Sequence, residues 1–202
     1  MMGQCFLRGY QYPDRMGGMA TTVTYEEWLR MPEVQDATEE VIDGEIRITA
    51  PAKWVHAWTI SNIRNALATH LDDPEFLIAT AQFGLVIRKA PLTARVPDPA
   101  VFETSTIVEL DGFVHSPPQL VAEVLAPGED LSRKLADYAS LGVPEVWVVS
   151  PEARTVEILI RENGGLRVTQ TPSHGTFTSP HFPHVTVNVE DFWRTWCSRQ
   201  VQ

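Results

Sequence analysis

Apolar residues recur at helical spacing in two long segments of the chain. In residues 55–71 (VHAWTISNIRNALATHL) they form one stripe, made of Ile60, Ile63, Leu67 and Leu71. In residues 129–141 (EDLSRKLADYASL) the stripe is made of Leu131, Leu135 and Tyr138. Gly142, which follows this second segment, is typical of a helix C-terminus. A short third helix is predicted after Thr24, because Thr24 and Glu27 have the spacing of a capping box.

Most other apolar runs are short, rich in β-branched and aromatic residues and separated by turn formers, as is typical of strands. Two hairpins are predicted, one over residues 39–51 around Asp43-Gly44 and one over residues 155–170 around Asn163-Gly164. The almost wholly apolar EVWVVS (145–150) is typical of a central strand. Further strand segments are predicted over residues 76–88, 95–103, 118–126 and 184–193.

The order of these elements predicts one α/β (α+β) domain over residues 20–197. We expect a central mixed sheet flanked by the helices 55–71 and 129–141, with an N-terminal hairpin and C-terminal strands. A chain of 202 residues can bury most of its apolar surface in one domain. Residues 1–19 lack periodicity, and we predict that they form a disordered N-terminal extension.

Composition indicates an ordinary globular protein, with 44% hydrophobic and 21% charged residues. No apolar run reaches the length of a membrane span, and the N-terminus lacks the apolar core of a secretory signal. The two cysteines, Cys5 and Cys197, are too few for a disulfide scaffold or a four-cysteine zinc site. We therefore predict a reducing compartment, a cytoplasmic location and no membrane partner.

The formal net charge of −10 argues against sequence-independent binding of nucleic acid, since phosphate contacts need basic surface. It does not exclude a nuclease, because a metal-binding cleft is itself acidic before the cation arrives. A local basic patch could offset the acidic surface, and the candidates for it are Arg88, Lys89, Arg95 and Arg133.

Two carboxylates and one lysine are the candidates for chemistry. Asp98 lies in VPDPAVF at the start of an apolar strand, and Glu123 is the single charge in LVAEVLA. A carboxylate in such a strand is costly to bury unless it is paired, hydrogen-bonded or bound to a metal. Lys134 lies on the next helix, about 60° from the centre of the apolar stripe. Two hard oxygen ligands and a cationic donor suit hydrolysis of a phosphodiester with Mg²⁺ or Mn²⁺.

The same residues carry a family resemblance. VPDPAVF, LVAEVLAP and K-x3-Y-x3-GVPEVWVVSP, in this order, resemble the restriction-endonuclease-like family known as Uma, a branch of the PD-(D/E)XK nucleases. EEVIDGEI and the histidine near the start of the following helix, His56, also resemble that family. The resemblance extends from about residue 22 to residue 193 and implies a restriction-endonuclease-like fold.

The resemblance implies roles for several residues. Asp98 and Glu123 would be metal ligands, Lys134 the catalytic lysine and Glu40 an accessory acid. In the parent superfamily the lysine is expected two residues after the acid, where this chain has Leu125, so Lys134 would replace it from the helix. The substrate would be DNA and the cofactor Mg²⁺ or Mn²⁺.

Three further expectations complete this hypothesis. A backbone carbonyl near Val124 would complete the metal ligands. His56 is an accessory site residue, although a histidine at a helix start more often caps or packs. A homodimer would provide the two sites that cutting both strands of a duplex requires.

The rival hypothesis is a catalytically inactive module with the same fold that binds nucleic acid or protein. The acidic net charge and Leu125 favour it. Geometry discriminates the two, because an enzyme needs Asp98 and Glu123 on adjacent strands with the Lys134 amine nearby, whereas dispersed side chains favour the module. A zinc site at His174, His181 and His184 is disfavoured, since they lie in a proline-broken loop without helical pairing. No Gly-x-Gly-x-x-Gly, Walker or Gly-x-Ser-x-Gly pattern occurs.

Overall fold

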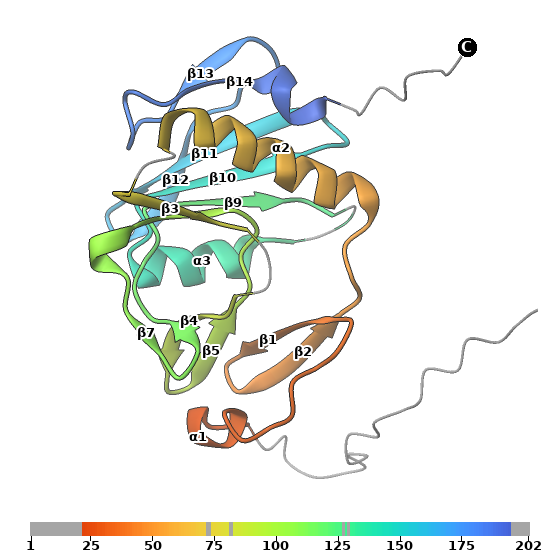
Figure 1. The fold of residues 1–202 in the computed structure, drawn as a ribbon, viewed down its shortest axis with the longest axis vertical. Helices are drawn as coiled ribbons and strands as arrows, with labels where there is room; N and C mark the ends of the chain where they lie inside the picture. Colours follow the sequence, from red (N-terminus) through yellow and green to blue (C-terminus); the bar gives the residue numbers. More distant parts are fainter. Residues whose placement is uncertain (1–21, 72–73, 81–82, 127, 129, 195–202) are drawn as a thin grey trace, which may run out of the picture.

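The centre of the fold is a mixed sheet with a helix on each face (Figure 1). The computed structural model describes residues 22–71, 74–80, 83–126, 128 and 130–194, so the extension predicted over residues 1–19 lies outside it. The central sheet has the order β12-β11-β10-β9-β6-β3, and β9 and β10 are its parallel pair. Its strands are β3 (Phe76–Ala79), β6 (Ala100–Glu103), β9 (Leu120–Val124), β10 (Glu145–Ser150), β11 (Thr155–Glu162) and β12 (Gly165–Gln170).

A second sheet lies below the first in Figure 1 and has the order β2-β1-β5-β4-β8-β7. Its strands are β1 (Thr38–Ile42), β2 (Glu45–Thr49), β4 (Leu85–Lys89), β5 (Leu92–Arg95), β7 (Glu109–Leu110) and β8 (Phe113–Val114). The short helices α1 (Tyr25–Trp28) and η1 (Thr104–Thr106) accompany these strands in the chain. Thr24 and Glu27 form the predicted capping box at α1.

The second sheet corrects two strand predictions. Residues 76–88, predicted as one strand segment, contain β3 of the central sheet and β4 of the second sheet. Residues 95–103 likewise contain the end of β5, in the second sheet, and β6, in the central sheet. The second division falls at Pro97 and Pro99, which have no N–H to donate to a ladder. The chain therefore crosses from one sheet to the other beside Asp98.

The two predicted helices cover opposite faces of the central sheet (Figure 1). α2 (Trp54–Leu71) buries Ile63, Leu67 and Leu71, as predicted. The same core contains residues of the C-terminal elements β13 (Thr176–Thr178), β14 (Thr186–Asn188) and η2 (Val189–Trp193). α3 (Ser132–Leu141) packs on the other face through Leu131 and Tyr138 and ends at Gly142, whose φ is 101°. No helix among the described residues is long and apolar enough to cross a membrane.

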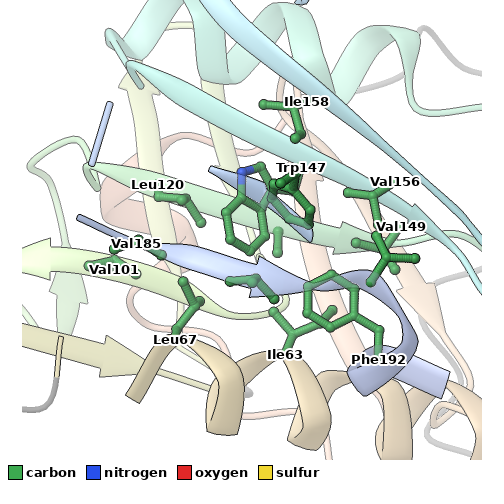
Figure 2. Packing of buried hydrophobic residues seen from close by; sticks show 14 of the residues in the cluster. Ile63, Leu67, Val101, Leu120, Trp147, Val149, Val156, Ile158, Val185 and Phe192 are labelled. Carbon is green, nitrogen blue, oxygen red and sulfur yellow. The ribbon is translucent and has the colours of Figure 1, made fainter. Parts of the chain in front are cut away.

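Trp147 of β10 lies at the centre of the larger core. Figure 2 shows its ring among Leu120, Ile158 and the residues of α2 and η2. It meets Phe177 edge-on, with ring centroids 5.0 Å apart, and its own side chain is fully buried. Burial of such a side chain contributes about 1.5–3 kcal/mol. The core therefore fixes β10 and its neighbour β9, the strand that carries Glu123 and Val124.

The turn at Gly44 gives a first prediction, because Gly164 provides a matched control. Both glycines follow a residue with φ 51° and have φ 82° themselves. A Cβ at Gly44 would lie 2.4 Å from the Cβ of Thr22, whereas one at Gly164 would meet nothing within 4 Å. We expect Gly164→Ala to cost about 1 kcal/mol from backbone strain and Gly44→Ala about 1–3 kcal/mol more. Urea unfolding of both variants tests this, and equal losses would contradict the steric argument.

Candidate active site

Glu123 lies in β9 and is the most deeply buried of the candidate carboxylates, with 2% of its surface exposed. Helix α3 binds both of its oxygens. The Lys134 ammonium lies 2.8 Å from Oε2, and the Tyr138 hydroxyl donates a hydrogen bond to Oε1. Lys134 and Tyr138 are four residues apart and therefore share one side of the helix. The predicted approach of Lys134 from the helix to the sheet is the one observed.

Asp98 lies beside the end of β9, because β6, which begins two residues later, pairs with β9 in antiparallel register. Its Oδ2 accepts a hydrogen bond of 2.8 Å from the Val124 amide. The same oxygen lies 3.3 Å from Nε2 of His56, in the first turn of α2. These contacts bring Asp98, Glu123, Val124 and His56 to one end of the central sheet.

Glu40 reaches the same place from β1 of the second sheet. Its Oε1 accepts a hydrogen bond of 3.1 Å from the Val96 amide and lies 3.5 Å from the Lys134 ammonium. Lys134 also donates to the Val96 carbonyl, at 3.3 Å. The ammonium therefore lies between Glu40 and Glu123 and connects the two sheets. Lys134 is therefore not a surface lysine paired with an acid of its own helix.

The candidate site residues thus lie together and are not dispersed, which is the arrangement expected of an enzyme. Three other participants were not predicted: Tyr138, Arg95 and Asp137. Tyr138 was predicted as part of the apolar stripe and of the K-x3-Y motif, but without a role in the site. Its four-residue spacing from Lys134 is the signal that could have identified it.

Burial controls the charge of the site. It raises the pKa of Glu123 to about 7, an effect that the nearby charge of Asp98 reinforces and that Lys134 only partly offsets. Burial would lower the pKa of Lys134, but the charges of Glu123 and Glu40 outweigh it and raise that pKa. Burial and the Glu123 charge also raise the pKa of Tyr138. At neutral pH Lys134 is therefore a cation and Tyr138 a hydrogen-bond donor.

The candidate basic patch is not a set of free cations, because its arginines are paired with carboxylates of the same chain. Arg95 is 3% exposed and binds Asp137 through Nε and Nη2, at 2.9 and 2.6 Å. Its Nη1 lies 3.1 Å from Glu40. Arg88 pairs with Asp137 and Asp43, and Arg133 also pairs with Asp43. The remaining member, Lys89, lies 4.0 Å above the ring of Tyr25.

The oxygen donors suit a hard divalent cation. Among the described residues, no three His, Cys, Asp or Glu side chains gather as a metal-binding group. Asp98 and Glu123 are two carboxylates on neighbouring chain segments, and the charge of Asp98 raises the pKa of Glu123. A cation would relieve that repulsion. Magnesium is commonly held by one or two carboxylates and completes its shell with water, so two carboxylates and a carbonyl fit it.

A mixed sheet with a helix on each face, and two carboxylates beside a lysine at one end of it, agree with the restriction-endonuclease-like fold that the motifs imply. The chain belongs to the Uma2 family, whose model, described as "Putative restriction endonuclease", matches residues 25–190. This confirms the resemblance found in the motifs.

A solved structure shares the fold. It is described as a "putative nuclease" of the DUF820 family from Anabaena variabilis, with a TM-score of 0.68 and 18% sequence identity. The match covers 85% of this chain and 97% of that one. No curated protein matches the chain.

Proposed function

We propose that this chain is a metal-dependent endonuclease that hydrolyses DNA phosphodiester bonds. One observation carries the proposal: the Lys134 ammonium lies 2.8 Å from Glu123, whose strand neighbours the segment that carries Asp98. Burial of a lysine beside two carboxylates costs desolvation energy, so a fold does not keep such a group for stability alone. Two carboxylates that can hold a metal ion, together with a cationic donor, are the groups that phosphodiester hydrolysis needs. Family membership and the nuclease-like fold support it.

Asp98, Glu123 and the Val124 carbonyl would hold Mg²⁺ or Mn²⁺. When bound, the ion supplies a Lewis acid for the phosphoryl oxygen and acidifies a water ligand. Lys134 would donate a hydrogen bond to the attacking water or to the phosphoryl oxygen on which charge develops. It is suited to this role because its raised pKa keeps it charged at neutral pH.

Glu40 and His56 act in this proposal as positioning residues. Glu40 is held by the Val96 amide and by Arg95, and it places Lys134 from the side opposite Glu123. His56 fixes Asp98 from helix α2. A homodimer would place two such sites on one duplex, and it remains a prediction, as does the cytoplasmic location.

The test is calorimetric titration of Mg²⁺ and Mn²⁺ into the wild type and Glu123→Gln, followed by a plasmid-nicking assay of both. We expect saturable binding and nicking by the wild type and the loss of both in the variant. Glu103→Gln is the control, because Glu103 ends β6 outside the site and bonds Ser105. No metal binding by the wild type, with or without DNA, would overturn the mechanism. Metal binding without nicking would favour the inactive module.

The pH dependence of metal binding is a second prediction. A metal ion requires the charged form of Glu123, whose pKa is about 7, so binding must release a proton below that pH. The metal affinity should therefore rise with pH, by about tenfold between pH 6 and pH 8. Calorimetry in buffers of different ionisation enthalpy measures both the affinity and the protons released. A flat profile without proton release would contradict the role of Glu123 as a ligand.

A further inference from the structure

The first turns of α2 carry a pair of aromatic residues, the exposed Trp54 and the half-buried Trp58. Their rings stack, with centroids 5.5 Å apart and planes 20° from parallel. Trp54 is 71% exposed, and its neighbour Val55 is 61% exposed. The Trp58 indole N–H donates to the Arg194 carbonyl, which fixes the orientation of its ring. Exposed apolar surface of this size on one helix turn is typical of a binding surface.

The pair lies at the same end of α2 as the candidate site. His56, between the two tryptophans in sequence, contacts Asp98 at 3.3 Å. Helix geometry places His56 on the inner side of α2 and the tryptophans on its outer side, so about one helix diameter, 10–12 Å, separates them from the carboxylate.

Charge along α2 favours a nucleic-acid strand at this position. The whole chain has a net charge of −10, yet residues 53–71 contain Lys53 and Arg64 and no acidic residue, while Arg47 just before them pairs with Glu45. Lys53 directly precedes Trp54 and is exposed. An anionic strand can therefore approach α2 although the protein as a whole repels it.

We propose that Trp54 and Trp58 form a stacking site for an unpaired base of the substrate, next to the phosphodiester that is cut. The inference rests on the proposed function and specifies its substrate as single-stranded or locally unpaired DNA. Because the arginines of the candidate basic patch are paired within the chain, phosphate contacts offer little affinity, whereas stacking on an aromatic face is independent of phosphate charge. A base within a duplex is stacked on its neighbours and cannot reach the pair.

The test is fluorescence anisotropy with a labelled oligothymidine and a duplex of the same length, both in EDTA. Trp54→Ala should weaken binding of the single strand about tenfold or more and leave the weak duplex binding unchanged. Trp54→Phe should retain most of the affinity. Leu77→Ala is the control, since Leu77 is an exposed apolar residue on β3.

Equal affinity of wild type and Trp54→Ala for the single strand would overturn the stacking site. So would a lower oligomeric mass of Trp54→Ala in light scattering, because the pair would then be a contact between two copies of this chain. Metal titration and nicking of the same variant separate this outcome from failure of the proposed function. A Trp54→Ala protein that binds metal and nicks as well as the wild type leaves the nuclease proposal intact and removes only the stacking site.

Discussion

Lys134→Met is expected to reduce plasmid nicking by about 10²- to 10³-fold, the usual effect of removing one donor that stabilises developing charge. Methionine keeps most of the apolar length of the side chain but not the ammonium. Glu123 loses an ion pair of 2.8 Å and keeps the hydrogen bond from Tyr138. Since its pKa is already raised to about 7, it can take up a proton instead of remaining an unpaired buried charge.

The measurement compares the nicking rate with the metal affinity of the same variant at pH 8.5, where Glu123 is charged in the wild type. Because the lysine is not a ligand, we expect the rate at saturating metal to fall, while the affinity falls only as far as the added protonation of Glu123 requires. Lys89→Met is the control, since Lys89 belongs to the second sheet and contacts Tyr25. Unchanged nicking by Lys134→Met would contradict a catalytic role, and equal loss of rate and affinity would make the lysine a support for the carboxylates.

The position of Lys134 could be predicted because it depends on local geometry. A helix fixes the direction of each side chain relative to its apolar stripe, and the stripe of residues 129–141 was clear in the sequence. The buried carboxylate was predictable for a similar reason, since Glu123 is the single charge in an apolar strand. Local pattern also identified α2 and the hairpin at Asp43-Gly44.

Pairing between distant segments could not be predicted in this way. The pattern of residues 95–103 indicates extended chain, but it does not show that β5 pairs with β1 and β6 with β9. The second sheet was missed for this reason. The pairing of Arg95 was missed for the same reason: its partners Asp137 and Glu40 are 42 and 55 residues away, so the sequence offered nothing to distinguish it from a surface arginine.

Arg95→Met is expected to cost about 3–5 kcal/mol of the free energy of unfolding, because it leaves buried carboxylates without their main cation. The Arg95 side chain is 4% exposed and that of Asp137 is 7% exposed. Asp137 would retain one contact with Arg88, at 3.1 Å, and Glu40 would retain the Val96 amide and the more distant Lys134. The loss is large because the desolvated charges cannot return to water without opening the junction between the sheets.

Urea unfolding measures this loss, and Arg167→Met is the matched control. Arg167 and Glu162 approach to 2.5 Å, closer than Arg95 and Asp137, but their side chains are 62% and 50% exposed. Water screens such a pair, so the control should lose less than about 1 kcal/mol. Arg95→Lys should lie between the two variants, since one ammonium cannot replace three N–H groups directed at two carboxylates. If Arg95→Met lost no more than the control, burial would not determine the energy of this network, and Glu40 would need another explanation for its position beside Lys134.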